Sequence, residues 1–457
     1  MPILISLFFS LGGITNAMVA FTSGVCFLFG GFFVYYIALK LLGRATANIS
    51  LLFYFTNPIL LRYAISGKEI CLLTLLMLAL VTFLLMFLEK NTNLIASGIG
   101  VILACMFLAR YWTIVFMLPV GILIYATSKM ENVSKLLFAF FSFLAVVSPW
   151  WVRNAYLTGN PLFTLNSIGV KSFLSGIPLA DFFKNIDMIN IGKVNMLAVL
   201  KRFLANLDFS YTGLLLLTRN FILSFFVIGF FCRFKKAAPS FVTFKHLVLV
   251  FMCLIFLLSG FSREIGEYLT MLIPFIIIIG VGFLFEMWHR LDIKRALFRK
   301  MVMPVFILVN MVPFCFALAL PSVREDAVSK KNLLYLQSII GKDKVVISDI
   351  PWKIAWEINR PCVWLPVEKE DFNRIIEAAK KQQTPLEFAY ITRGVLNYPL
   401  SSDKNIWKRL YIEGIIPDDF YFEQGMLLPG KNLFLGLDKD LQAIKKRSRK
   451  YFLKHNG

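Results

Sequence analysis

The chain has 457 residues, of which 58% are hydrophobic and only 16% are charged. Several uninterrupted apolar runs approach the roughly 20 residues that a helix needs to cross a bilayer, which excludes a soluble protein. A formal charge of +21 would suit a nucleic-acid-binding protein, but in so apolar a chain the basic residues are first compared with membrane topology. The unequal distribution of these residues between the short loops accounts for the charge without a nucleic acid partner.

The cysteines and histidines form no recognisable site. The seven cysteines lie mostly within apolar runs and have no regular spacing, so we expect small buried hydrophobic residues without disulfides. The three histidines lie at helix ends or in the tail, which excludes a histidine-ligated zinc centre. The sequence therefore predicts no metal site from these residue types.

The apolar runs predict a polytopic α-helical membrane domain over residues 1–320. Its outer loop, 152–211, contains a segment at 179–204 in which charged and apolar residues alternate at roughly helical spacing. This pattern is typical of a helix in the membrane interface, and equally of a packed loop helix. The ten expected spans are 17–39, 48–62, 70–88, 93–109, 111–127, 134–151, 212–232, 246–261, 267–287 and 302–320.

The basic residues of the short loops are distributed unevenly between the two sides. Alternate loops on one side carry fourteen Lys and Arg residues, and the opposite loops carry only Arg62, Lys68, Arg110 and Arg263. The positive-inside rule places the richer side in the cytoplasm, so the loop 152–211 and everything after residue 321 should lie outside. Met1 should then also lie outside, and we expect a further span upstream of it.

Residues 321–457 have the pattern of a globular α/β domain outside the membrane. Strands are expected at 345–348, 362–366, 387–392 and 433–437, and helices at 325–340, 352–358 and 369–381. The basic tail at 444–455 is expected to be solvated or to touch lipid headgroups.

Charged residues at the outward ends of the spans are the candidate functional groups, because charge at membrane depth is costly. They include Arg62, Glu69, Arg110, Arg153 and Arg263. Arginine suits phosphate or pyrophosphate, since its fork binds two oxygens at once and stays charged. Snorkelling to headgroups is the alternative for each arginine alone. Their gathering on the face that the positive-inside rule depletes of cations favours a shared anion site.

The stretch SPWWVRNAYLTGNPLF (148–163) follows the sixth span. Trp150 and Trp151 are expected at the outer interface, where indole rings prefer to lie. Arg153 then emerges at headgroup height, where a phosphate-bearing lipid headgroup is the expected partner.

Four segments, in order, resemble the polytopic GT-C glycosyltransferases of the dolichyl-phosphate-mannose protein mannosyltransferase and aminoarabinose transferase type, a glycosyltransferase family 39-like group. They are LLGRATANISLLFYFTNPILLRYAISGKEICLLTLL (41–76), FLARYWTIVFMLPVGILIYA (107–126), the stretch 148–163 and FSREIGEYLTMLIPF (261–275). An outer domain with VVISDIPWKIAWEINRPCVWLP (345–366) follows. The resemblance extends from residue 2 to about 366 and depends on the order and spacing of these segments.

The resemblance implies an integral protein of the bacterial cytoplasmic membrane that moves a sugar from a polyprenyl-phosphate donor to a lipid or protein acceptor at the outer face. In this family cationic groups, sometimes with a divalent metal, stabilise the departing phosphate. Glu69 matches an acidic position at the outer start of a span, and Arg110 matches the basic residue between two paired spans. Arg263 and Tyr268 stand near the family's Arg-Tyr pair, although Glu267 rather than Arg precedes the tyrosine.

The resemblance therefore implies donor-phosphate binding by Arg110, Arg263, Tyr268, Arg153 and Arg62. The family's catalytic Asp or Glu lies on an outer loop that would precede Met1, which leaves Glu69 as the substitute candidate. Three alternatives stay open: a transporter or flippase of lipid-linked sugars, an O-antigen polymerase or ligase, and a pseudo-enzyme whose outer domain only binds a partner. A transporter predicts related halves and charges near the bilayer midplane, neither of which is visible here.

Overall fold

A computed structural model describes residues 2–127, 132–162, 173–174, 195–216, 222–290 except 236, 296–319 and most of 332–436. The chain divides into two compact units. The first consists of Met1–Phe173 and Asn195–Leu320, and the second consists of Leu174–Val194 and Pro321–Gly457. Each unit is described by itself.

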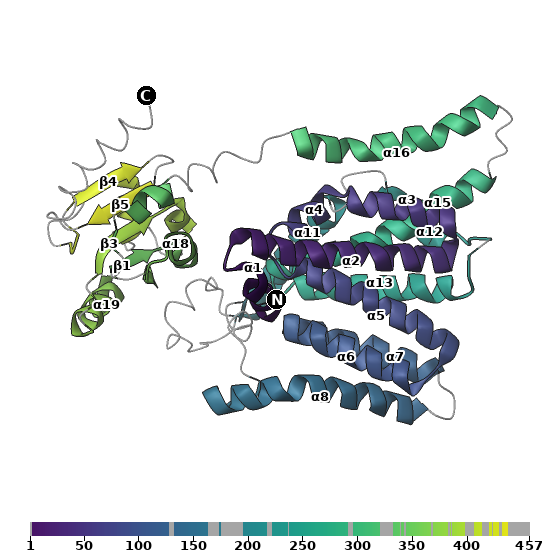
Figure 1. The fold of residues 1–457 in the computed structure, drawn as a ribbon, viewed down its shortest axis with the longest axis horizontal. Helices are drawn as coiled ribbons and strands as arrows, with labels where there is room; N and C mark the ends of the chain where they lie inside the picture. Colours follow the sequence, from purple (N-terminus) through teal and green to yellow (C-terminus); the bar gives the residue numbers. More distant parts are fainter. Residues whose placement is uncertain are drawn as a thin grey trace. The chain divides into compact units, whose positions relative to one another are not determined.

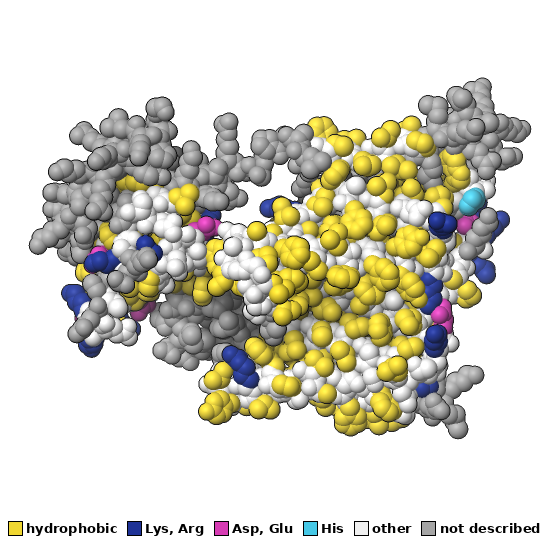
Figure 2. Space-filling view, in the orientation of Figure 1, with side chains coloured by type: hydrophobic (Ala, Val, Ile, Leu, Met, Phe, Trp, Pro, Cys, Tyr) yellow, Lys and Arg dark blue, Asp and Glu magenta, His cyan; other side chains and the backbone are white. Residues whose placement is uncertain are grey.

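The first unit is a bundle of apolar helices (Figure 1). By length and composition, five of the described helical stretches could cross a membrane, and shorter apolar helices accompany them. Hydrophobic side chains cover a broad belt of its visible surface, as lipid contact requires (Figure 2). The principal helices are α1 (Pro2–Gly12), α2 (Asn16–Leu42), α3 (Arg44–Phe55), α4 (Pro58–Ala64), α5 (Ile70–Lys90), α6 (Asn93–Ala109), α7 (Met117–Thr127), α8 (Asn132–Thr158), α11 (Met196–Leu216), α12 (Ile222–Phe231), α13 (Ser240–Ser259), α15 (Ile273–Arg290) and α16 (Ala296–Ala319).

The predicted spans correspond broadly to these helices, although several bounds shift and the spans at 111–127 and 267–287 begin with 3-10 turns. Two differences are larger. The expected span at 48–62 is divided into α3 and α4, because the side chain of Asn57 caps α4 by accepting the N–H groups of Ile59 and Leu60 and Pro58 takes its first position. The expected start of a span at residue 212 is wrong: α11 runs without interruption from Met196 to Leu216. Most of the predicted interfacial helix at 179–204 lies outside the described residues.

The centre of the first unit is α15, in which every residue from Ile273 to Leu284 is buried. Around it, helices pack most closely where glycine leaves room. A Cβ atom on Gly100 of α6 would lie 2.0 Å from the carbonyl oxygen of Ala139 on α8, so the backbones of these two helices are in direct contact. A larger side chain at that position would force the helices apart.

A buried lysine closes the end of α12. The Nζ of Lys245, on α13, donates hydrogen bonds to the carbonyl oxygens of Phe230 at 2.8 Å and Cys232 at 2.9 Å. It also lies 5.5 Å from the centroids of the Phe234 and Phe241 rings. The ammonium group thus satisfies carbonyls that the helix end leaves unpaired, and the aromatic rings shield it.

The second unit contains a five-stranded sheet in the order β2-β1-β3-β5-β4. Its strands are β1 (Val345–Ser348), β2 (Cys362–Trp364), β3 (Leu386–Ile391), β4 (Gln424–Leu428) and β5 (Asn432–Gly436). The strands β2, β1 and β3 are parallel, and β5 pairs antiparallel with both β3 and β4.

Helices α18 (Pro351–Ile358) and α19 (Lys369–Lys381) connect the parallel strands, as the sequence predicts. The prediction omitted β4 and α20 (Ile406–Glu413), although Trp407 of α20 is completely buried against Phe372. The side chain of Asp349, just after β1, accepts hydrogen bonds from the N–H and hydroxyl groups of Thr392, just after β3. This contact joins the carboxyl ends of two parallel strands.

Candidate functional site

The site is built where three chain segments end or begin at the same end of the first unit. Glu69 immediately precedes α5, after a turn at Gly67 whose φ of +71° is disfavoured for other residues. There is also no room for a side chain at this position, because a Cβ on Gly67 would lie 2.2 Å from the Cγ1 atom of Val19. The carboxylate of Glu69 is 19% exposed.

Arg110 brings a cation to this carboxylate. It follows α6 in an extended conformation, with φ −153° and ψ 116°, and begins the short 3-10 helix η1 (Tyr111–Phe116). Its Nε and Nη2 atoms lie 2.7 and 2.5 Å from Oε1 of Glu69. With 32% of its side chain exposed, the guanidinium group can be reached from solvent or lipid headgroups.

Tyr268 completes the cluster from the helical segment that leads into α15. Its hydroxyl group donates to the same Oε1 of Glu69 at 2.5 Å, and the Arg110 guanidinium lies 5.6 Å from its ring centroid. The residue itself is only 4% exposed. We refer to Glu69, Arg110 and Tyr268 as the Glu-Arg-Tyr cluster.

Electrostatics keep Glu69 ionised. Burial alone would raise the pKa of its carboxyl group, but the hydrogen bond from Tyr268 and the charge of Arg110 oppose that effect and hold the pKa below its ordinary value. The cluster is therefore a carboxylate and a guanidinium that neutralise each other at neutral pH. A carboxylate so placed accepts hydrogen bonds and is a poor acceptor of a proton.

An aromatic wall surrounds the cluster. Trp112 packs on Tyr268 with ring centroids 5.3 Å apart, and the indole N–H of Trp150 donates to the hydroxyl group of Tyr111 at 2.5 Å. The exposed Arg153 lies over Trp150, 4.8 Å from the ring centroid. Sequence reasoning missed Tyr111 and Trp112, although their position directly after Arg110 was the available signal.

The remaining predicted residues are not brought into the cluster by any described contact. Arg62 is exposed on α4. Arg263 begins a short helix, Arg263–Glu267, but its side chain lies outside the described residues. A second ion pair, Lys68 with Glu267 at 2.9 Å, lies beside the cluster and is about half exposed, so it contributes little to stability. Among the described residues, no three His, Cys, Asp or Glu side chains are grouped so that they could hold a metal ion.

The opposite end of the first unit carries the short loops that are rich in Lys and Arg, and we call it the basic end. There Lys40 pairs with Glu89 at 2.7 Å, and Glu286 pairs with Arg290 at 2.8 Å. Because Glu69 and Glu89 stand at the two ends of α5, the basic end lies about 30 Å from the Glu-Arg-Tyr cluster.

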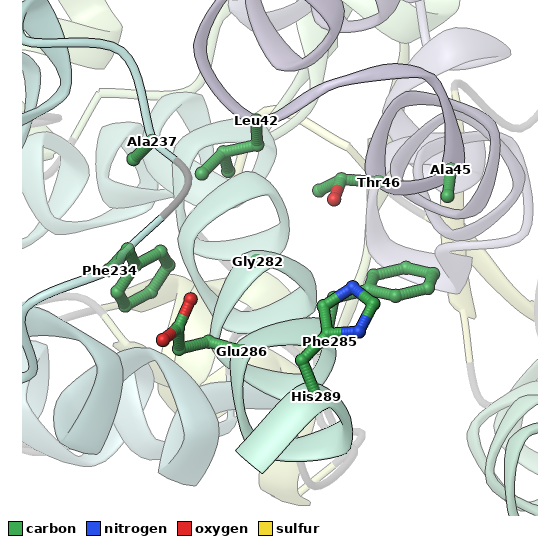
Figure 3. A pocket seen from close by; sticks show the side chains of 9 residues that line it. All are labelled: Leu42, Ala45, Thr46, Phe234, Ala237, Gly282, Phe285, Glu286 and His289. Atoms are coloured by element: carbon green, nitrogen blue, oxygen red, sulfur yellow. The ribbon is translucent and has the colours of Figure 1, made fainter.

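The basic end contains a cavity of about 80 Å³ (Figure 3). It is lined by Leu42, Ala45, Thr46, Phe234, Ala237, Gly282, Phe285, Glu286 and His289.

Comparison with known proteins identifies the fold. Residues 1–152, which include Glu69 and Arg110, match the family model for dolichyl-phosphate-mannose-protein mannosyltransferase. No curated protein matches the sequence of this chain. The crystal structure of ArnT from Cupriavidus metallidurans bound to undecaprenyl phosphate is similar, with a TM-score of 0.55, 11% identity, and coverage of 94% of this chain and 86% of that one. ArnT from the same organism in the apo state gives a TM-score of 0.45 and 9% identity, with coverage of 96% and 87%.

The structural similarity extends over both units, and the family model matches the part of the chain that supplies Glu69 and Arg110. The fold that the sequence motifs implied is therefore confirmed. The chain is an integral membrane protein of the GT-C glycosyltransferase fold.

Proposed function

We propose that this protein is a membrane glycosyltransferase that transfers a sugar from a polyprenyl-phosphate donor to a lipid or protein acceptor. The match of residues 1–152 to a mannosyltransferase family supports the reaction class. The undecaprenyl phosphate bound in the similar ArnT structure supports the donor class. The observation that carries the site is the convergence of Arg110 and Tyr268 on one carboxylate oxygen.

In our proposal the Glu-Arg-Tyr cluster receives the donor phosphate. Arg110 already binds an anion there, since the Glu69 carboxylate occupies its Nε and Nη2 donors. A phosphate oxygen has the same charge and the same need for paired N–H donors. The phosphate would share or replace Glu69 at the guanidinium group, and the hydroxyl group of Tyr268 would supply a further hydrogen bond.

The proposed reaction requires a positively charged group next to the departing phosphate. During transfer, the bond between the sugar's anomeric carbon and the phosphate oxygen breaks, and a bond forms from that carbon to the acceptor oxygen. Negative charge accumulates on the departing polyprenyl phosphate, where a fixed guanidinium stabilises it. The acceptor's proton must go to a base, and the lowered pKa of Glu69 argues against that residue. We assign Glu69 the role of orienting Arg110.

The distribution of basic residues supports an outer position for the cluster, so we also propose that the α/β unit lies outside the cytoplasm. A cysteine introduced at exposed Lys353 of that unit should react with a thiol reagent that cannot cross the membrane, in sealed right-side-out vesicles. Labelling only after the vesicles are permeabilised would reverse the orientation.

The reaction is tested with the full chain in membrane vesicles supplied with an undecaprenyl-phosphate-linked sugar. The measured quantity is undecaprenyl phosphate released per unit time. Replacing Arg110→Ala should lower the release at least tenfold, because a hydrogen bond to a charged group contributes about 1.5–3 kcal/mol. Arg110→Lys should recover part of it, since the charge remains without the fork.

Arg374→Ala is the control, because Arg374 is exposed on α19 and is not among the predicted donor-phosphate residues. It should release undecaprenyl phosphate at the rate of the unaltered protein. Equal rates for Arg110→Ala and Arg374→Ala would remove Arg110 from the donor site. Donor binding without any release by the unaltered protein would favour a pseudo-enzyme or a transporter over a transferase.

A further inference from the structure

We propose that the cavity at the basic end of the first unit binds a phosphate group, contributed by a phosphate-bearing lipid or by free phosphate. The cavity lies between the end of α2, the start of α3 and the last turns of α15, where Leu42, Thr46 and Glu286 line it (Figure 3). Since the Glu-Arg-Tyr cluster is at the other end of the bundle, this phosphate is not the donor phosphate of the proposed reaction.

The start of α3 provides the first feature. This helix of 12 residues begins at Arg44, directly after Gly43, whose φ of 90° admits few residues other than glycine. No side chain caps it, so its first N–H groups lack the usual acceptor. Those groups and the helix dipole attract an anion. Ala45 and Thr46, in the first turn, both line the cavity.

The hydroxyl group of Thr46 provides the second feature. This residue is only 3% exposed, and its hydroxyl group is directed into the cavity (Figure 3). Among the buried threonines that the structure describes in the first unit, Thr46 alone has no hydrogen bond. The others donate to a carbonyl oxygen three or four residues earlier in the chain: Thr22, Thr74, Thr82, Thr113 and Thr270. The hydroxyl group of Thr46 therefore has no partner among the described residues of the protein and is available to a ligand in the cavity.

Glu286 also lines the cavity, and its charge is already compensated. Its Oε1 atom accepts from Arg290 at 2.8 Å, and its Oε2 atom accepts the backbone N–H of Lys235 at 3.2 Å. Figure 3 shows the carboxylate turned toward Phe234 and away from Thr46. The region around Thr46 is thus left to the helix start and to His289, which adds a further donor at the cavity.

Size and surroundings restrict the ligand. A cavity of about 80 Å³ is small and suits one phosphate group better than a nucleotide. Arg44, the residue before Ala45, supplies positive charge at this end. A lipid phosphate would enter with its acyl chains outside the cavity.

The test uses the purified full-length protein in dodecyl maltoside micelles and measures its thermal unfolding midpoint. Phosphatidylglycerol, inorganic phosphate and diacylglycerol are titrated separately. If only phosphatidylglycerol raises the unfolding midpoint, the ligand is a lipid phosphate. If inorganic phosphate raises the midpoint as well, the site accepts phosphate from either source. Diacylglycerol, which has no phosphate, should cause no comparable rise.

Two variants connect the response to the cavity. Thr46→Val keeps the shape of the side chain and should weaken the apparent affinity about tenfold, because one hydrogen bond to a charged ligand is lost. Thr74→Val, which removes a hydroxyl group that bonds within α5, is the matched control and should leave the affinity unchanged. Ala45→Asp places a carboxylate at the helix start, so it should abolish the response without lowering the midpoint of the ligand-free protein.

A folding defect cannot imitate this pattern, because Ala45→Asp is expected to favour the helix while it repels the ligand. Responses to phosphatidylglycerol and diacylglycerol that are equal would overturn the proposal. So would a phosphate response that both Thr46→Val and Ala45→Asp leave intact, and so would the absence of any response, which would mean that the cavity holds water only.

Discussion

Replacing Tyr268→Phe tests the electrostatic description of the Glu-Arg-Tyr cluster. The ring, which is 4% exposed and packs on Trp112, stays in place, and only the hydroxyl group that donates to Glu69 is lost. A hydrogen bond to a charged group contributes about 1.5–3 kcal/mol. Because Glu69 is 19% exposed and keeps its contact with Arg110, the lower value, about 1.5 kcal/mol, is expected at pH 7.

The pH dependence gives the sharper result. The pKa of Glu69 is lowered in the folded protein, so the stabilisation is present above its ordinary value of 4.5 and is lost as the pH falls through the folded value. Removing the Tyr268 hydroxyl group moves that pKa upward. The difference in unfolding free energy between the two proteins should therefore shrink on acidification, to about 0.5–1 kcal/mol once the carboxyl group is protonated.

Denaturant unfolding in detergent micelles, at pH 7 and at a series of falling pH values below 4.5, measures this difference. Tyr54→Phe is the control, since the hydroxyl group of the buried Tyr54 donates to the neutral carbonyl oxygen of Phe27 at 2.9 Å. Its loss should destabilise the protein equally at every pH. If Tyr268→Phe behaves in the same way as Tyr54→Phe, the description of Glu69 as an ionised acceptor is refuted.

Three further predictions concern features away from the cluster. Lys245→Met should lower the unfolding free energy by about 1–3 kcal/mol, because the carbonyl oxygens at the end of α12 lose their donor; denaturant unfolding in micelles measures it. Gly100→Val should lower the thermal unfolding midpoint because α6 and α8 touch there, whereas Gly213→Val, with no heavy atom within 4 Å, should leave it nearly unchanged. Asp349→Ala should increase proteolysis of the α/β unit, since both hydrogen bonds to Thr392 are lost.

Sequence patterns predicted regular elements well and the interruptions less well. The helices at 93–109 and 369–381 and the strand at 345–348 have the predicted bounds, because polar residues or turns flank each of them and the strand is a short apolar run. The break before Pro58 was missed, since hydropathy continues through it, although Asn57 and Pro58 are the residues that start α4. Strand β4 was missed because five residues pairing with a neighbouring strand carry little periodic signal.

The candidate site could be predicted only in part. The positive-inside rule predicted Glu69 and Arg110 at one membrane face, and the family resemblance selected them together with Arg263 and Tyr268. Neither source could show that the two side chains are in contact, because 41 residues separate them in the chain. Tertiary packing of α5, α6 and the segment before α15 brings them together.

The close crossing of α6 and α8 has a mechanical consequence for the Glu-Arg-Tyr cluster. The two helices touch at Gly100 and are joined again where Trp150 of α8 holds Tyr111, the residue after Arg110. Because α6 and α8 are in contact near Gly100 and α8 is hydrogen-bonded to the segment that follows α6, a tilt of one helix should be transmitted to the other. A sideways movement of α8 near Trp150 is therefore expected to shift Arg110 relative to Glu69 as well.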